Sequence, residues 1–261
     1  MLRAADLGFA YDARRPVLAG VSLEVRAGAL VGVLGPNGSG KTTLLRLLAG
    51  IRRPTSGRVT LDGRPLPTYS RRELAGRMAV VPQETHLAFD YSVMEMVLMG
   101  RHPHLGLFQV EGPADLAVAR DALAATGVAH LEDRDFATLS GGEKQRVIIA
   151  AALAQATDVL LLDEPTSSLD LGAQIDIAHL LVELNTMRGV TIVVSTHDLA
   201  LASGICRELV LLRQGRVLAA GAIADVLTAA NVRALYDVDA DIHVHAGTGQ
   251  LSVVPLRRTP R

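Results

Sequence analysis

Residues 35–42, GPNGSGKT, space their glycines, lysine and threonine as a phosphate-binding loop does. The preceding run LVGVL, residues 30–34, is typical of a buried strand, and TTLLRLLAG, residues 42–50, places leucines at helical spacing. A loop between a strand and a helix start offers backbone N–H groups and partial positive charge to a phosphate. The sequence therefore predicts a nucleoside triphosphate site, although a glycine-rich turn that merely enters a helix is the plain alternative.

Lys41 and Thr42 carry the side chains that such a site needs. The Lys41 ammonium would pair with the β- and γ-phosphates, and the Thr42 hydroxyl would ligate Mg²⁺. The chain has one other lysine, Lys144, and otherwise uses arginine for positive charge. The residues predicted to hold the phosphates are Gly35, Pro36, Asn37, Gly38, Ser39, Gly40, Lys41, Thr42 and Thr43.

Two carboxylates follow an apolar run in VLLLDEP, residues 159–165. The run favours a buried parallel strand, and α/β sheets place ligands at the carboxyl edge where such strands end. Asp163 would hold Mg²⁺ through water, and Glu164 would orient or deprotonate an attacking water. An ordinary acidic turn is the alternative, which the phosphate loop upstream disfavours. The pair of carboxylates favours hydrolysis over binding alone.

His197 and Tyr11 are further candidates, each with a plain structural alternative. His197 follows the apolar strand of TIVVSTHD, residues 191–198. A histidine there would hydrogen-bond the γ-phosphate or fix the catalytic water, whereas a lone histidine is more often structural. Tyr11 would stack on an adenine ring or pack as an ordinary tyrosine. The residues alone do not decide the role of Tyr11.

A second glycine-rich helix start lies in ATLSGGEKQRVIIAAALAQ, residues 137–155. Ser140, Gly141 and Gly142 precede a strongly periodic helical run, and a serine in that place is a capping signal. The same start would also offer free N–H groups to a phosphate. The pattern leaves a plain cap and a second anion site equally open.

The rest of the chain supplies the elements that would position these residues. Residues 84–157 have the apolar spacing of a helical lobe inserted between strands. A hairpin is expected to turn at Gln214 and Gly215, and residues 222–236 to form one or two short helices. Further strands are expected at residues 2–11, 17–25, 57–63 and 78–83, with a final pair within 242–255.

Composition limits the classes of protein. With 261 residues, 49% of them apolar, the chain can bury a large core. No apolar run reaches the roughly 18 residues that cross a bilayer, and Met1 leads into charged sequence instead of a signal peptide, so a cytosolic location is expected. A net charge of −1 gives no general basis for binding nucleic acid. The single cysteine, Cys206, excludes an internal disulfide and fits a buried apolar role.

Three basic or histidine-containing segments carry weaker signals. His102 and His104 flank a proline without nearby cysteines or carboxylates, so a surface loop is preferred to a metal site. His243 and His245 would share a strand face, again without an evident third ligand. The basic end PLRRTPR, residues 255–261, is expected to be a solvated tail.

Three motifs together resemble those of the ATP-binding subunits of ABC transporters: GPNGSGKT, LSGGEKQ and VLLLDE, in that order. TSSLD, residues 166–170, is similar to the D-loop of that family, and Gln83 to its Q-loop glutamine. His197 resembles the switch histidine, and Tyr11 the adenine-stacking aromatic. The resemblance covers essentially the whole chain and implies nucleotide contacts for Tyr11 and Ser140, and for Gln83 a role in catalysis and Mg²⁺ binding.

The fold implied by this resemblance is α/β: a P-loop NTPase core with an N-terminal antiparallel β subdomain and an inserted α-helical subdomain. One ABC ATP-binding domain would span residues 1–261. Its implied parts are the core with the β subdomain (1–83 and 158–240), the helical subdomain (84–157), and C-terminal strands with a tail (241–261).

The resemblance also implies a homodimer that closes on two ATP molecules with Mg²⁺. Each ATP would lie between one phosphate loop and the opposite copy's Ser140, Gly141 and Gly142, and Asp170 would couple the two sites. ATP binding would close the dimer, and hydrolysis would release it.

The segments SVMEMVLMGRHPHLGLF and ALYDVDADIHVHAGTGQLSVVP resemble the subfamily that serves importers of iron–siderophore complexes, haem and vitamin B12. The implied protein is the ATPase of a bacterial importer on the cytoplasmic face of the inner membrane, with a transmembrane permease dimer and, indirectly, a periplasmic binding protein. The alternatives are another importer class such as metal ion, a non-transport ABC ATPase, and a regulatory module without turnover. The cargo is not predicted.

Overall fold

The computed structural model describes residues 1–12, 15–83, 89–106, 108–247 and 249–258. The chain divides into two compact units, the first made of Met1–Thr68 with Thr191–Arg261 and the second of Tyr69–Val190. In the described parts of both units, none of the helices combines the length and the apolar character needed to cross a bilayer.

The first unit begins with an antiparallel sheet whose strands are β1 (Leu2–Asp12), β2 (Arg15–Val25), β4 (Ser56–Leu61) and β5 (Arg64–Pro65), in the order β2-β1-β4-β5. Leu2 and Ala4 are buried while Arg3 between them is exposed, because successive side chains of a strand point to opposite faces. A short 3₁₀ turn, η1 (Leu66–Thr68), follows β5. The strands predicted near the N-terminus are confirmed.

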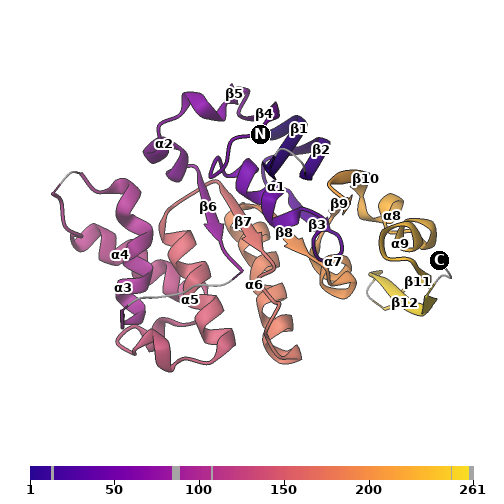
Figure 1. Cartoon of the computed structure of the whole chain (residues 1–261). Helices are drawn as coiled ribbons and strands as arrows, with labels where there is room; N and C mark the ends of the chain where they lie inside the picture. Colours follow the sequence, from indigo (N-terminus) through magenta and orange to yellow (C-terminus); the bar gives the residue numbers. More distant parts are fainter. Residues whose placement is uncertain (13–14, 84–88, 107, 248, 259–261) are drawn as a thin grey trace. The chain divides into compact units, whose positions relative to one another are not determined.

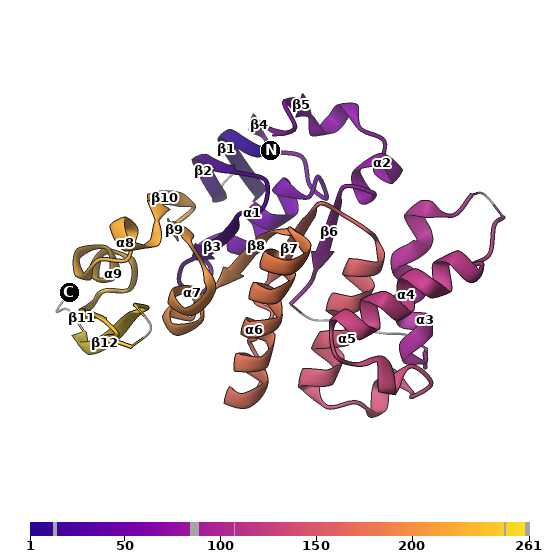
Figure 2. The ribbon, with the colours of Figure 1, turned by 180° about the vertical axis from the view of Figure 1, so that it is seen from behind.

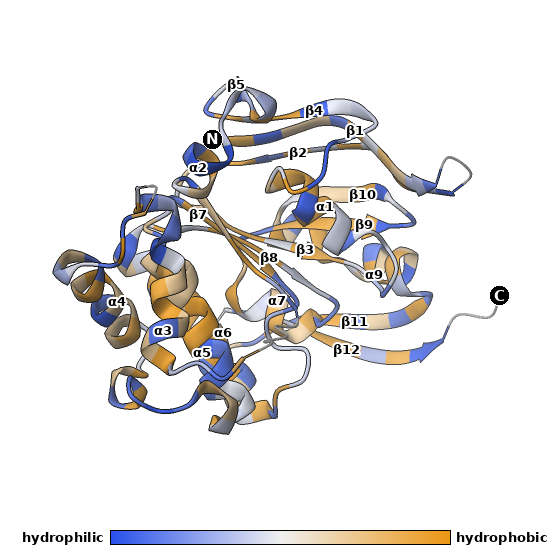
Figure 3. Ribbon diagram, turned by 60° about the vertical axis from the view of Figure 1, so that its left-hand side comes forward, coloured by the Kyte–Doolittle hydropathy of each residue, from blue (hydrophilic) through white to orange (hydrophobic). Residues whose placement is uncertain are grey.

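The phosphate loop directly follows β3 (Leu30–Leu34). In the same unit this strand shares a sheet with β8 (Thr191–Thr196), β9 (Glu208–Arg213) and β10 (Arg216–Ala222). β3 lies between β8 and β9 and is parallel to both, and β10 pairs antiparallel with β9 after the predicted turn. Every residue of β3 is buried, as expected of a strand covered on both faces. Helices α1 (Lys41–Leu48) and α7 (Leu199–Ile205) pack on these strands, and hydrophobic colour dominates β3 and β8 in Figure 3.

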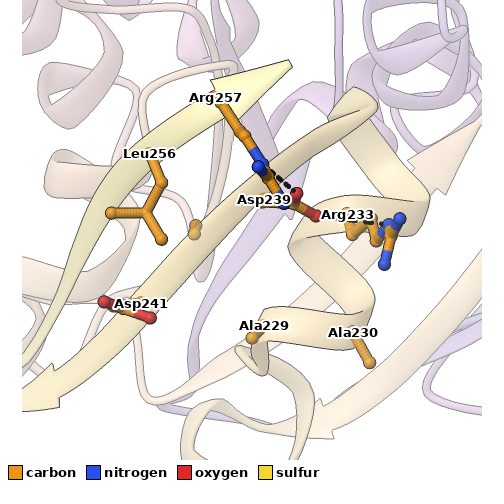
Figure 4. Close-up of a pocket in the computed structure, with 8 residues that line it drawn as sticks. Ala229, Ala230, Arg233, Asp239, Asp241, Leu256 and Arg257 are labelled. Carbon is orange, nitrogen blue, oxygen red and sulfur yellow. Dashed lines mark hydrogen bonds and ion pairs between the residues drawn. The ribbon is translucent and has the colours of Figure 1, made fainter. Parts of the chain in front are cut away.

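The C-terminal part of the first unit contains α8 (Ile223–Val226), α9 (Ala229–Tyr236) and the hairpin of β11 (Val238–Val244) and β12 (Leu251–Arg258). The carboxylate of Asp239 on β11 forms ion pairs with two arginines (Figure 4). Its Oδ1 lies 3.3 Å from Nε of Arg233 of α9, and its Oδ2 lies 3.1 Å from Nε of Arg257 of β12. A cavity of about 560 Å³ adjoins these three side chains. Residues 255–258 are exposed, as expected of a solvated tail, but they form the end of strand β12, where Arg257 pairs with Asp239; residues 259–261 lie outside the described residues.

The second unit contains a parallel pair of strands, β6 (Met78–Val81) and β7 (Val159–Asp163), and most of the helices. The predicted helical region is seen as α3, α4 and α5 grouped together (Figure 1). The sequence patterns did not predict the short α2 or the long α6. The helices and 3₁₀ turns of this unit are α2 (Arg71–Ala75), α3 (Val93–Leu98), η2 (Met99–His104), α4 (Pro113–Ala125), η3 (Ala129–Leu131), η4 (Phe136–Thr138), α5 (Gly141–Ala154) and α6 (Leu171–Arg188).

The helices of the second unit share an apolar core. Val97 of α3, Leu123 of α4 and Val147 of α5 are fully buried in one cluster, with Phe136 beside them. Burial of such side chains contributes about 1.5–3 kcal/mol each. Arg101 and Asp115, an ion pair of 3.0 Å between atoms Nε and Oδ1, join η2 to α4 at the edge of this core. This core holds α5, the helix that begins directly after Ser140.

Candidate functional site

The phosphate loop connects β3 to α1 through backbone shapes that glycine permits. Gly38 and Gly40 have φ angles of 77° and 106°, which side chains rarely allow. A Cβ atom on Gly35 would lie 2.2 Å from the carbonyl oxygen of Leu212. α1 begins at Lys41 without a side-chain cap on its first turn. Uncapped N–H groups at a helix start are suited to an anion, so the loop fits a phosphate.

Two buried polar side chains strengthen that fit. Lys41 is 4% exposed, and its Nζ donates to the carbonyl oxygens of Gly35 at 2.9 Å and Pro36 at 3.2 Å. Ser39 is 3% exposed, and its Oγ has no hydrogen-bond partner among the described residues. A buried hydroxyl without a partner is costly, so a ligand oxygen at this position would stabilise the loop.

The remaining loop residues differ in exposure. Asn37 is exposed, Pro36 and Thr42 are half buried, and Thr43 is buried. Thr42 lies in the first turn of α1, where its hydroxyl is an oxygen donor of the kind that Mg²⁺ prefers.

Tyr11 lies beside this helix and remains 55% exposed. Its ring packs edge to face on Phe9 at 4.9 Å, and its hydroxyl is 3.4 Å from Oγ1 of Thr43. The bond with Thr43, followed by smaller contributions from Arg46 and Arg52, lowers the pKa of Tyr11 against the opposing effect of burial. The guanidinium of Arg52 lies 5.9 Å from the ring centre. No sequence pattern had singled out either arginine.

His197 follows β8 in the same unit. The backbone N–H of Gly35 donates to the carbonyl oxygen of Thr196 at 3.3 Å, so the loop begins beside the end of β8. The His197 side chain is exposed, and its carbonyl oxygen accepts a hydrogen bond from the Tyr236 hydroxyl at 3.0 Å. The first unit thus brings the loop, Tyr11 and the His197 segment together, while the catalytic role of His197 stays a prediction.

Asp163 is the last residue of β7 in the second unit and Glu164 follows it; their side chains are buried, at 6% and 9% exposed. Glu164 has a φ of 48°, a left-handed conformation that costs a residue with a side chain about 1–2 kcal/mol. Its carbonyl oxygen accepts from the N–H of Ser167 at 3.1 Å, which closes the turn after the strand. Such strain is typical of functional positions.

Gln83 follows β6, which runs parallel to β7 with Val81 opposite Leu162. Because both strands end at the same edge, Gln83 and Asp163 leave this pair in the same direction. The Gln83 side chain is exposed. Its predicted roles in Mg²⁺ binding and catalysis are not tested by this placement.

Ser140 caps α5 in a reciprocal arrangement with Glu143. The Ser140 Oγ accepts from the Glu143 N–H at 3.3 Å, and Glu143 Oε2 accepts from the N–H and the hydroxyl of Ser140, each at 2.8 Å. The Ser140 backbone bond, and then its hydroxyl, lower the pKa of Glu143. Ser140 and Gly141 are exposed, and Gly142 is half buried. The structure shows the cap; the anion role stays a prediction. Glu143 was not singled out from the sequence, although a serine three residues before a glutamate is the pattern that predicts such a reciprocal cap.

Asp170 caps the neighbouring helix α6, since its Oδ1 accepts from the N–H of Ala173 at 2.9 Å. Its side chain is exposed. The second unit therefore holds two sets of predicted residues: the strand-edge carboxylates with Gln83, and the two capped helix starts.

The two histidine pairs form no metal site with the other residues that the structure describes, where no group of three or more potential ligands occurs. The Nε2 atom of His104 lies 2.7 Å from the carbonyl oxygen of Gln155, which gives this side chain a structural contact. The expected irregular loop is here the 3₁₀ turn η2, which contains both His102 and His104.

A family comparison matches residues 18–167 to the family described as ABC transporter. The chain belongs to the ABC transporter family. The matched span contains the phosphate loop, the Ser140 helix start and the Asp163–Glu164 pair. Together with the solved structures below, it confirms the predicted fold class of an ABC ATPase.

Relatives of this ABC protein cover most of its length. The ferric enterobactin transport ATP-binding protein FepC of Escherichia coli K12 is 39% identical over 99% of this chain and 95% of FepC. The hemin import ATP-binding protein HmuV of Thermobifida fusca is 42% identical over 98% of this chain and 89% of that protein. The cobalamin import ATP-binding protein BtuD of Halobacterium salinarum is 44% identical over 92% of this chain, which spans only 60% of the length of BtuD.

Two solved structures show the same ABC fold. A structure described as a metal-chelate type ABC transporter in an inward-facing conformation is 34% identical, with a TM-score of 0.86 over 98% of this chain and 96% of that one. A dimeric structure of the cassette MJ0796 is 28% identical, with a TM-score of 0.74 over 85% of this chain and 99% of that one.

Proposed function

We propose that this chain is the ATP-hydrolysing subunit of a bacterial ABC importer. The observation that carries the proposal is the phosphate loop, which combines an uncapped helix start, a buried Lys41 ammonium and a buried Ser39 hydroxyl without a partner. Each of these features is satisfied by a triphosphate tail. Tyr11, beside the same helix, would receive the adenine ring on its exposed side.

Hydrolysis is assigned to residues of both units. Glu164 would accept a proton from the attacking water, Gln83 would orient that water, and His197 would hydrogen-bond the γ-phosphate. Thr42, Gln83 and Asp163 would hold Mg²⁺, directly or through water, and the ion would neutralise charge on the phosphate oxygens. Lys41 would stabilise the same charge by direct contact.

The second glycine-rich helix start supports a homodimer. Ser140 and Gly141 are exposed, so another copy can reach them. In the proposed dimer, the first-turn N–H groups of α5 meet the γ-phosphate held by the opposite copy, and Asp170 lies at the joint between the two sites. The relative MJ0796 has been solved as a dimer.

Import is proposed from the relatives, whose names specify transport of ferric enterobactin, hemin and cobalamin. The chain would dock on the cytoplasmic face of a permease dimer, and a periplasmic binding protein would deliver an iron chelate, haem or cobalamin. ATP-driven closure would then move the permease helices.

The deciding experiment compares wild type with Glu164→Gln. The variant should bind ATP with unchanged affinity, lose about 100-fold or more of its turnover, and accumulate ATP-bound dimers, because general-base removal typically costs 10²–10⁴-fold. Glu24→Gln, a change of an exposed carboxylate on β2, is the matched control. Wild-type turnover in Glu164→Gln would remove this residue from the catalytic role.

Copurification from membranes separates the alternatives. Recovery of a permease, followed by binding of an iron chelate, haem or cobalamin to its periplasmic partner, supports the proposal. A permease whose partner binds a bare metal ion indicates another importer class. Recovery of nucleic acid or ribosomes in place of a permease indicates a non-transport ABC ATPase.

A further inference from the structure

Two helix starts of the second unit line one cavity. α5 begins after Ser140 and α6 begins after Asp170, and both segments border a space of about 320 Å³. The helices lie side by side (Figure 2). Each start uses its own cap, so the cavity is bounded by two independently closed first turns.

The two starts pack closely against each other. A Cβ on Gly142 would lie 3.0 Å from Cβ of Ala173, and a Cβ on Gly141 would lie 3.2 Å from Cδ2 of Leu169. These distances are shorter than ordinary carbon contacts of about 3.5–4.0 Å. The two helix starts are therefore close neighbours, although this packing alone does not lock one to the other.

One arginine ties the same helices together one turn further along. The Nη2 atom of Arg146 lies 3.2 Å from Oδ2 of Asp176, and its Nη1 atom donates to the carbonyl oxygen of Thr126 at 2.9 Å. Arg146 is four residues after Gly142, and Asp176 is three residues after Ala173, so each is on the same helix face as the packed pair. The guanidinium thus connects α5, α6 and the end of α4.

We propose that Arg146, through Asp176, is a positioning residue that makes the Ser140 start and the Asp170 start a single rigid surface for the second copy of the chain. This inference rests on the proposed dimer, in which both starts must meet the opposite copy together. With the ion pair broken, each start would sample its own orientations, and closure would have to order them at an entropic cost.

The stability contribution of this pair should be small, which makes the inference testable. The side chains of Arg146 and Asp176 are 25% and 62% exposed, and partly exposed ion pairs add little to folding. A substitution at Asp176 should therefore leave the fold intact while it changes how readily the dimer closes.

The test measures the ATP concentration that gives half-maximal dimerisation by light scattering, in the Glu164→Gln background. Asp176→Asn should raise that concentration about three- to tenfold, within the range of pairwise coupling between contacting residues. Nucleotide affinity of the isolated subunit and its melting temperature should be unchanged. Asp176→Glu, which keeps the carboxylate, should restore much of the loss.

Asp121→Asn is the matched control. It removes another carboxylate that pairs with α6, the 2.7 Å contact between Oδ2 of Asp121 and Nη1 of Arg188 at the opposite end of that helix. This variant should dimerise as the parent does. Equal ATP requirements for Asp176→Asn and Asp121→Asn would overturn the positioning role alone. A parent that never dimerises with ATP would contradict the proposed function and overturn this inference with it.

Discussion

The phosphate loop and the Ser140 segment are both glycine-rich helix starts, yet they are built in opposite ways. The loop before α1 has no side-chain cap and surrounds a buried lysine. The segment before α5 is closed by Ser140 and Glu143 and is exposed. The first is a nearly complete anion cradle, whereas the second is already closed by its own side chains.

Two helix starts with similar sequences therefore differ in how many of their backbone N–H groups still lack a hydrogen-bond acceptor. An uncapped start leaves N–H donors to be satisfied by a ligand, so the loop gains most when phosphate binds. A capped start is already stable, so its gain on meeting a phosphate is smaller. The two regions should therefore respond differently to substitution.

The largest contrast is expected between the two lysines. Lys41→Ala should weaken ATP binding by about 1.5–3 kcal/mol, roughly ten- to hundredfold, because it removes a charge-assisted contact to phosphate. Lys144→Ala should leave ATP affinity of the isolated subunit unchanged, since Lys144 lies on the capped helix α5 and its Nζ donates to the carbonyl oxygen of Ala137 in η4. Equilibrium titration with a fluorescent ATP analogue measures both. Unchanged affinity in Lys41→Ala would contradict the phosphate-loop assignment.

The next effect concerns the exposed start. Ser140→Arg should leave nucleotide binding by the isolated subunit intact and weaken ATP-induced dimerisation by tenfold or more, about 1.4 kcal/mol, because a large side chain obstructs the approaching copy. Size-exclusion chromatography with ATP checks this, and Ala129→Arg, at another exposed position of the same unit, is the control. Normal dimerisation of Ser140→Arg would argue that the start lies outside the interface.

Replacement of one glycine in each helix start by alanine should affect the free energy of unfolding differently. Gly40→Ala should cost roughly 1–3 kcal/mol, because Gly40 has a φ of 106° and the new Cβ would lie 2.7 Å from Cδ2 of Leu18. Gly142→Ala should change stability by less than about 1 kcal/mol, since helix propensity offsets the close contact with Ala173. Urea unfolding measures the two, and equal losses would remove this distinction.

The smallest effect is the pH dependence of the cap. The pKa of Glu143 is lowered from 4.5 in the fold, so its stabilising contribution is present above that value and is lost as pH falls through the lowered pKa. Glu143→Gln should cost about 1 kcal/mol or less near neutral pH, and the difference should vanish in acid. Unfolding curves across this range, with Glu24→Gln as control, test the sign. A difference that grows in acid would contradict it.

Sequence patterns predicted most of the strands and the candidate side chains of the site, but less of the local geometry around them. β3, β7 and β8 were evident because buried parallel strands leave continuous apolar runs. α6 was missed because its apolar residues follow TSSLD, which was interpreted as a loop motif. The cap of Ser140 was predicted only as one of two alternatives, since glycine-rich helix starts serve both.

Contacts between distant residues left no trace in the patterns. Arg52 lies near Tyr11 only because the fold brings β1 beside the segment after α1, and Arg146 pairs with Asp176 across two helices. The strand beyond Pro255 was not predicted for the same reason, because it forms by pairing with β11, where Arg257 meets Asp239. Pairing of this kind depends on tertiary structure.

The left-handed backbone at Glu164 opposes the thermal stability of the fold to the proposed catalytic role of this residue. Glycine would suit that backbone angle better than any residue with a side chain, so Glu164→Gly should resist heating more than a variant that keeps a Cβ. It would also lack the carboxylate that we propose accepts a proton from the attacking water. A screen for variants with higher melting temperature alone would therefore favour replacement of Glu164 by glycine.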